Sequence, residues 1–140
     1  MIEMNEQLSC IFEVNLPSVA ASITEVENLI EKTCTQLQLS EEIFGNILIA
    51  VTEGVNNAIL HGNQSQSSLS VHFGIHNNEN WICFRIKDEG KGFDPELIPD
   101  PTAPENLLKE SGRGVFLMRS LADDVVFENN ATVVNIYFKR

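Results

Sequence analysis

Three short stretches of the chain carry side chains or glycines at spacings that suit chemistry on a charged ligand. In the first, Thr52 to Asn63, Glu53 and Asn57 stand four residues apart, so they share one face of a helix. A carboxylate and an amide on one face can serve a metal-bound nucleotide and the water or hydroxyl that attacks it. Such a pair is also common on solvated helices, and surface decoration is the more frequent explanation when the pair is considered alone.

The second stretch, Asp88-Glu89-Gly90-Lys91-Gly92, follows an alternating apolar run. Its glycines let the backbone approach a flat ligand closely. An Asp at the end of a strand can also accept a hydrogen bond from an exocyclic amine such as that of adenine. A plain turn explains this stretch more often when it stands alone, because Asp and Gly are common turn residues.

The third stretch, Ser111-Gly112-Arg113-Gly114, precedes a helical pattern of apolar residues. Free backbone N–H groups at the start of a helix form an anion site when no side chain obstructs them. The stretch matches neither the phosphate-binding loop pattern nor the three-glycine dinucleotide fingerprint. A glycine-rich helix start explains it equally well, so the combination and order of the three stretches matter more than any one of them.

Apolar periodicity places these stretches on strands and helices. The predicted strands are 8–14, 69–75, 82–86, 125–127 and 132–138, and the predicted helices are 19–39, 40–62 and 115–121. This order predicts a single α+β domain, residues 1–140. We expect a two-layer α/β sandwich in which a mixed, mainly antiparallel sheet is covered on one face by the helices. The proline-rich segment 93–111 is predicted to be a lid or binding loop.

The net charge of −11 at pH 7 makes nucleic acid and anionic membranes poor partners for this chain. No apolar run approaches the ~18 residues of a membrane helix, and the acidic N-terminus lacks the pattern of a signal peptide. Cys10, Cys34 and Cys83 show no metal-binding spacing and are predicted to be small buried residues. We therefore expect a cytoplasmic protein, in which a nucleotide would need help from a cation, a helix N-terminus or a few basic residues.

The three stretches in this order resemble the ATPase domain shared by histidine kinases, type II topoisomerases and MutL-type repair proteins, often called the Bergerat fold. Thr52 to Ala58 resembles its N-box, Asp88 to Phe93 its G1 box, and Gly112 to Gly114 its G2 box. Thr132 stands where the family has a Gly-Thr pair, with Ala131 in place of the glycine. Within that group the chain is similar to the anti-sigma-factor serine-protein kinases of bacteria.

The resemblance implies roles for individual residues in an ATP site with Mg²⁺. Glu53 would be the general base on the attacking hydroxyl or water, and Asn57 would ligate Mg²⁺. Asp88 would bind the adenine amino group, with Thr132 beside it. The other residues implied to contact the nucleotide or its phosphates are Gly90, Gly92, Lys109, Gly112, Arg113 and Gly114.

The resemblance also implies an activity and partners. The similarity in the runs 53–62 and 111–118 indicates an ATP-dependent serine/threonine protein kinase and anti-sigma factor that phosphorylates a small anti-anti-sigma protein. A sigma factor would be the second partner, and a homodimer a further assembly. Two alternatives stay open: a nucleotide-gated module that sequesters a regulator without catalysis, and an ATPase fragment of a larger machine.

Overall fold

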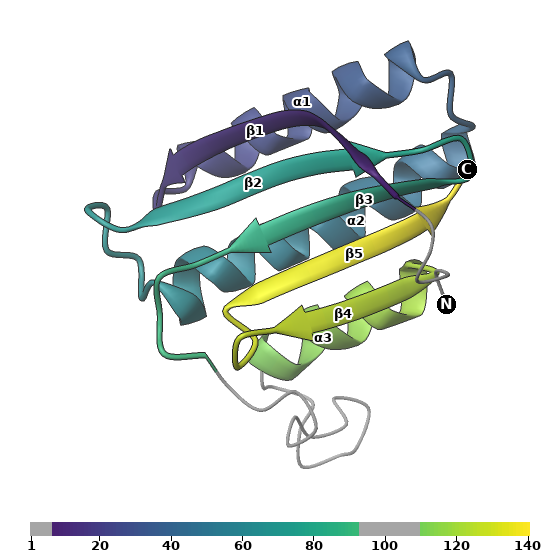
Figure 1. Ribbon diagram of the computed structural model, residues 1–140. Helices are drawn as coiled ribbons and strands as arrows, with labels where there is room; N and C mark the ends of the chain where they lie inside the picture. The colour runs from purple at the N-terminus through teal and green to yellow at the C-terminus, as the bar shows by residue number, and fades with distance from the viewer. Residues whose placement is uncertain (1–6, 93–109) are drawn as a thin grey trace.

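The computed structural model describes residues 7–92 and 110–140, which form one sheet with helices packed on one of its faces (Figure 1). The strands are β1 (Ser9–Pro17), β2 (Ser70–Asn77), β3 (Trp81–Lys87), β4 (Asp124–Glu128) and β5 (Val133–Lys139). The helices are α1 (Ala21–Gln36), α2 (Glu41–Asn57), the π-helix η1 (Ala58–Gly62) and α3 (Glu110–Leu121). Most of the segment predicted to be a lid lies outside the described residues.

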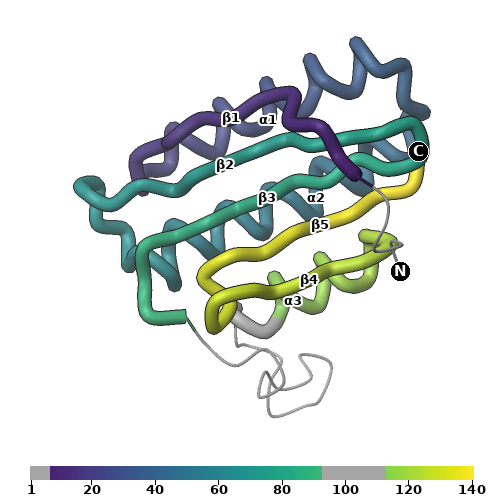
Figure 2. The backbone as a smooth tube through the Cα atoms, viewed as in Figure 1, coloured from purple at the N-terminus to yellow at the C-terminus, as the bar shows by residue number. Residues whose placement is uncertain are grey.

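The strands are ordered β1-β2-β3-β5-β4, and each of the four pairings is antiparallel. The predicted α+β fold is confirmed, and both predicted hairpins, β2–β3 and β4–β5, are present. The sheet of the described residues is antiparallel throughout rather than mixed, because β1 and β2, and likewise β3 and β5, also pair antiparallel. β5 lies between β3 and β4, so the last hairpin folds back beside the end of β3 (Figure 2). This pairing sets Lys87 opposite Val133, and it therefore brings Asp88 next to Thr132.

Helix α2 is the central element of the helical layer and contacts α1, α3 and the sheet (Figure 1). Ile47, Val51 and Val55 are fully buried, because steps of four residues place them on one stripe of the helix. Gly54 is also buried, and a Cβ atom there would come within 2.7 Å of Ile86 Cδ1. The glycine therefore lets the helix approach the sheet closely.

The continuous helical segment Glu41–Gly62 is long and apolar enough to cross a membrane, with a mean hydropathy of 1.4 over an 18-residue window. The expectation that no apolar segment is long enough for a membrane helix is therefore wrong, judged by the length and composition of this helix. The physical reason is that a central helix must present apolar residues to the sheet and to two neighbouring helices. A core helix of this kind passes the same test as a membrane span, so the segment is a weak indication of a membrane anchor.

The first strand is more exposed than its alternating residues predict. β1 lies at one edge of the sheet, and its Ile11 and Phe12 side chains are 45% and 37% exposed. A bulge between Cys10 and Phe12 shifts the register there, and Cys10 is exposed. The prediction of three buried cysteines is therefore wrong for Cys10, because an edge strand is covered by a neighbour on one side only. Cys34 and Cys83 are buried as predicted.

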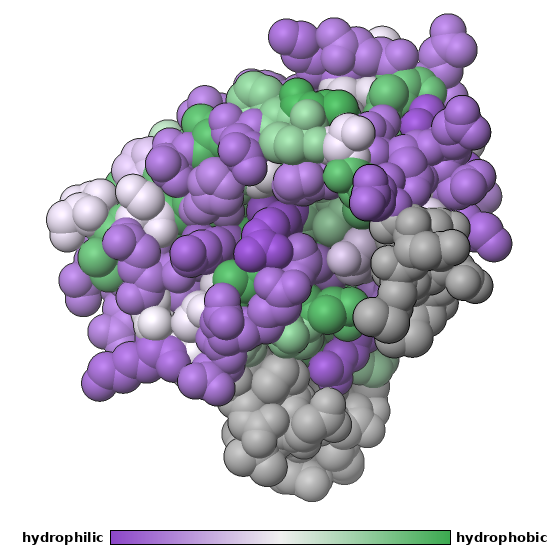
Figure 3. All heavy atoms as spheres, viewed as in Figure 1, coloured by the Kyte–Doolittle hydropathy of each residue, from purple (hydrophilic) through white to green (hydrophobic). Residues whose placement is uncertain are grey.

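The face of the sheet opposite the helices is largely hydrophilic (Figure 3). Polar side chains that alternate with core residues point to this face. Among them, Arg85 Nη1 lies 3.1 Å from Glu128 Oε2, with the two side chains 36% and 42% exposed. Such an exposed ion pair contributes about 0–1 kcal/mol, so this face adds little to stability through charge pairing.

Candidate functional site

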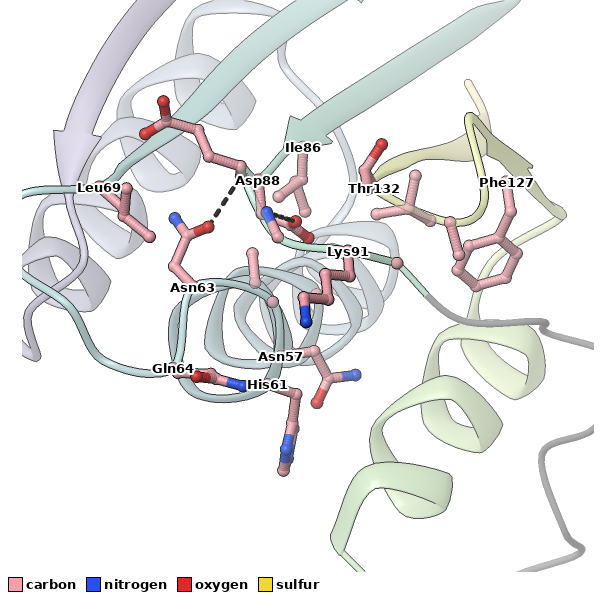
Figure 4. Close-up of a pocket in the computed structure, with 18 of the residues that line it drawn as sticks. Asn57, His61, Asn63, Gln64, Leu69, Ile86, Asp88, Lys91, Phe127 and Thr132 are labelled. Atoms are coloured by element: carbon pink, nitrogen blue, oxygen red, sulfur yellow. Dashed lines mark hydrogen bonds between the residues drawn. The ribbon is translucent and has the colours of Figure 1, made fainter.

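A cavity of about 460 Å³ opens between the end of α2, η1, the end of β3 and the β4–β5 hairpin (Figure 4). Its volume lies in the range of small-molecule sites. The structure brings together around it the predicted site residues Asn57, Asp88, Gly90, Gly92 and Thr132. Segments that are far apart in the sequence therefore meet at one concave surface.

Asp88 directly follows β3 and is held in the cavity by backbone hydrogen bonds. Its N–H donates to the Thr132 carbonyl at 2.9 Å, which fixes it beside the β4–β5 hairpin. Its Oδ1 accepts a hydrogen bond from the Gly90 N–H at 2.8 Å. Burial raises the pKa of the Asp88 carboxyl group, and the Gly90 hydrogen bond lowers it by a smaller amount. A partly desolvated carboxylate of this kind is a strong acceptor for a ligand N–H.

Glycines bring backbone segments together around Asp88. A Cβ atom at Gly62 would collide with the Asp88 carboxylate, and one at Gly90 would collide with the Gly62 carbonyl. Gly92 has a φ of +80°, and a Cβ atom there would collide with the Asn130 carbonyl. These positions therefore require glycine because neighbouring groups approach the backbone closely, and a plain turn does not explain them. Gly62 is an additional site residue that was not predicted, because in the sequence it has the appearance of an ordinary glycine at a helix end.

The helix that carries Asn57 widens into the π-helix η1 before it ends. The Asn63 N–H donates to the Ala58 carbonyl at 2.8 Å, which is the i to i−5 spacing of a π-helix. The sequence predicts an ordinary helix up to Gly62 instead. The wider turn brings Gly62 against Asp88. Helical periodicity could not predict this contact, because Asp88 follows a strand of the sheet that is far away in the sequence.

Asn63 is fully buried and joins the segments around the cavity. Its Nδ2 donates to Ser18 Oγ at 2.9 Å and to the Ser70 carbonyl at 3.0 Å. Its Oδ1 accepts from the Glu89 N–H at 2.7 Å, directly beside Asp88. Asn63 thus positions the loop that carries Asp88. Sequence reasoning missed it, because an Asn in a polar turn looks like any other turn residue.

Asn57 contacts the start of α3. Gly114 is buried there, and a Cβ atom on it would lie 2.5 Å from Asn57 Nδ2 and 2.9 Å from Asn57 Oδ1. Because α3 begins at Glu110, Gly112 and Gly114 lie within its first turns. The prediction that these glycines precede the helix is therefore wrong by about one turn. Gly114 lets α3 pack against the Asn57 amide.

Some predicted site residues lie apart from the cavity. Glu53 lies one turn before Asn57 on the same face of α2, is partly exposed, and falls outside the described lining of the cavity. Arg113 is exposed near the start of α3, and Lys109 lies outside the described residues. The structure therefore places Glu53 next to the cavity rather than within it.

Lys91 supplies a cation at the cavity that was not among the predicted site residues. Its side chain lines the cavity and extends from the loop after β3 in Figure 4. Ile86, Met118, Phe127 and Val134 line the cavity with apolar surface. Apolar walls beside a carboxylate suit a flat ring with an amine, and the Asn57 amide oxygen is a ligand of the hard kind that Mg²⁺ takes.

A family model of the histidine kinase-like ATPase domain matches residues 16–138, a range that includes every residue named above as lining the cavity. The chain therefore belongs to the histidine kinase-like ATPase family.

Among individual proteins, the chain is similar to the serine-protein kinase RsbW of Oceanobacillus iheyensis, with 27% identity over 128 residues that cover 87% of this chain and 81% of the relative. The serine-protein kinases RsbW of Staphylococcus epidermidis and Staphylococcus aureus are 26% and 27% identical, and each match covers 91% of this chain and 87% of the relative. The resemblance inferred from the three sequence stretches is thereby confirmed.

Proposed function

We propose that the cavity binds ATP together with Mg²⁺, with Asp88 accepting from the adenine amino group. The observation that carries this proposal is a partly desolvated carboxylate, that of Asp88, which shares one cavity with the side-chain amide of Asn57. Thr132 belongs to the adenine end, because its carbonyl accepts from the Asp88 N–H. Gly90 and Gly92 would leave room for the nucleotide beside the backbone.

The phosphate end of the proposed site combines an amide with nearby positive charge. Asn57 would hold Mg²⁺, which when bound neutralises phosphate charge that an acidic chain of net charge −11 repels. Lys91 lines the same cavity and would add a second cation. Lys109, Gly112 and Arg113 remain proposed phosphate contacts on the resemblance alone.

We further propose that the chain is a serine/threonine protein kinase in which Glu53 is the general base. The hydroxyl oxygen of a protein side chain forms a bond to the γ-phosphorus of ATP, while the bond from that phosphorus to the β–γ bridging oxygen breaks and ADP leaves. The hydroxyl proton passes to the Glu53 carboxylate. A partly exposed Glu53 beside the cavity is accessible to a protein hydroxyl that approaches from outside.

The acceptor that we propose is a small anti-anti-sigma protein, with a sigma factor as the second partner. This assignment rests on the similarity to serine-protein kinases RsbW and on the resemblance to anti-sigma-factor kinases. Residues 1–140 would act as one cytoplasmic domain. The exposed edge strand β1 is the surface that we assign to self-association.

Transfer of label from γ-labelled ATP to a purified anti-anti-sigma protein tests the proposed activity. Glu53→Gln should lower the transfer rate by about 100-fold or more, as expected for the loss of a general base, and leave nucleotide affinity unchanged. Glu31→Gln is the matched control, because Glu31 is exposed on α1.

Undiminished transfer by Glu53→Gln would show that Glu53 is not the base. Nucleotide binding without any transfer by the unaltered chain would favour the sequestering module instead.

A further inference from the structure

Cys10, Glu13 and His76 come together on the face of the sheet that the helices leave open. Their ligand-capable atoms all lie within 4.8 Å of one another. The nucleotide cavity lies between the sheet and the helices, so the two groups of residues are on different faces. Sequence spacing gives no sign of this cluster, because strand pairing alone brings the residues together.

The bulge in β1 places Cys10 and Glu13 on the same face. Residues three apart in a regular strand point to opposite faces, because the side-chain period is two. Here Cys10 is paired with His76 and Phe12 with Ile75, so Ile11 is the extra residue. The extra residue returns Glu13 to the face that carries Cys10 and His76.

His76 has an imidazole nitrogen without a partner in this cluster. Its Nε2 is buried and makes no hydrogen bond among the described residues. Gly74 leaves room for the ring, since a Cβ atom there would lie 3.2 Å from His76 Nε2 and 3.7 Å from Glu13 Cγ. Burial is the largest cause of a lowered pKa for His76, ahead of the opposing effect of Glu13. A buried nitrogen without a partner is unfavourable unless a ligand binds it, because burial removes the hydrogen bonds that water would make.

Neighbouring groups orient the other two side chains. The Cys10 thiol donates to the Phe12 carbonyl at 3.6 Å, within the bulge. His72 Nε2 lies 3.7 Å from Glu13 Oε1, and His72 Nδ1 lies 2.9 Å from Asn15 Oδ1. Such supporting partners hold the side chains of a metal site in orientation.

We propose that Cys10, Glu13 and His76 bind a divalent transition metal ion of the zinc class. A thiolate, a carboxylate and an imidazole are the ligands that Zn²⁺ takes, and three protein ligands leave a fourth position for water. Bond lengths of about 2.0–2.3 Å place such ligands roughly 3.5 Å apart, a separation that small rotations of the exposed Cys10 and Glu13 side chains can reach. The thiol releases its proton to solvent on binding, and no group is oxidised or reduced.

Titration of the full chain with Co²⁺ in the absence of nucleotide tests this proposal. Co²⁺ should produce a thiolate-to-metal absorption band that Zn²⁺ then abolishes, because a given site binds Zn²⁺ more tightly than Co²⁺. The band should be absent in Cys10→Ser. Glu13→Gln and His76→Gln should each weaken binding by about tenfold or more, whereas Glu25→Gln, an exposed change on α1, should leave it unchanged.

Zn²⁺ should also raise the thermal midpoint of the unaltered chain but not that of Cys10→Ser, because the ion joins edge strand β1 to β2. Circular dichroism of each variant checks that it is folded, and the exposed position of Cys10 makes Cys10→Ser the least disruptive change. The absence of a charge-transfer band in the unaltered chain, or an equal band in Cys10→Ser, would overturn the proposal.

Discussion

At the scale of single residues, the cavity depends on a partly buried carboxylate, on close backbone contacts and on a positive backbone φ angle, each of which is unfavourable for most residues. Asp88 is partly desolvated, and Gly62 and Gly90 are confined by the backbone around it. Ala131 has a φ of +64°, a left-handed conformation that costs an L-residue about 1–2 kcal/mol. A glycine at this position would adopt the same conformation without that cost.

Asp88→Asn should weaken adenine-nucleotide binding by about tenfold or more. The variant loses a charged acceptor, and a hydrogen bond to a charged group contributes about 1.5–3 kcal/mol. The asparagine side chain can keep the contact with the Gly90 N–H, so the loop should retain its shape. Equilibrium binding of ATP and GTP provides the measurement. Equal affinities of the unaltered chain for ATP and GTP would contradict the role of Asp88.

The same substitution should leave the nucleotide-free fold at least as stable at neutral pH. Because burial raises the pKa of Asp88 above 3.8, the stability that this carboxyl contributes is present at lower pH and is lost as pH rises through the raised value. The amide that replaces the carboxyl group does not ionise, so the variant avoids that loss. In thermal melts over a pH series, the difference in thermal midpoint between the variant and the unaltered chain should become smaller as the pH is lowered. A difference that does not vary with pH would contradict this explanation.

At the scale of elements, the site is built where α2, η1 and α3 meet the ends of β3 and β5. Helix α2 supplies Asn57, and its π-helical extension brings Gly62 against Asp88. Helix α3 packs on α2 through Gly114. Two helices and a loop therefore share the polar end of the cavity, and small residues at their contacts set how closely they approach.

Gly114→Ala should displace the Asn57 amide, because its Cβ atom would lie 2.5 Å from Asn57 Nδ2. We expect affinity for the magnesium nucleotide to fall by about tenfold or more, since a misplacement of about 1 Å has large effects in a binding site. We expect stability to change by less than about 1 kcal/mol, because the Asn57 amide can move aside and Ala has the better helix propensity. Calorimetric titration and denaturant unfolding measure the two effects.

Gly45→Ala is the matched control on α2. A Cβ atom at Gly45 would meet nothing within 4 Å, so the change should stabilise the fold by about 0.5–1 kcal/mol and leave affinity unchanged. Stabilisation by Gly114→Ala to the same extent, with affinity kept, would mean that the contact with Asn57 is not tight.

At the scale of the whole molecule, one antiparallel sheet and one apolar core hold the site together. The core joins Phe73, Phe84 and Ile136 of the sheet to residues of all three α-helices. Cys34 belongs to this core and Cys83 is buried in β3, whereas Cys10 is exposed on the edge strand. The cysteines therefore report on the intactness of the fold.

Thiol labelling should show one fast-reacting cysteine in the native chain and two that react only on unfolding. Burial raises the pKa of Cys34 to about 11 and that of Cys83 to about 12, so both stay protonated and inaccessible near pH 8. The stability that these two thiols contribute is present below their ordinary pKa and is lost as pH rises through the raised values. Cys10→Ser should remove the fast phase. Two fast thiols in the native chain would show that the core opens locally.

Much of the fold could be predicted from the sequence, because alternation and helical periodicity are local properties. They located each strand and α-helix to within a few residues, and the glycine-rich stretches pointed to Asp88, Gly90 and Gly92. The predicted half-buried β1 was less accurate, since burial of an edge strand depends on what lies beside it. Lys91 was missed, because the sequence did not show which loop side chains face the cavity.

The sequence by itself determined the elements, the acidic charge and the motifs, each of which depends on residues close together in the chain. Only the tertiary structure decided how the motifs meet. The insertion of β5 between β3 and β4 places Thr132 within hydrogen-bonding distance of Asp88. The buried Asn63 side chain hydrogen-bonds to Ser18, Ser70 and Glu89 and so joins three segments. A bulge in β1 brings Glu13 to the face that carries Cys10 and His76. These contacts link residues that are far apart in sequence, and packing of the whole sheet selects them.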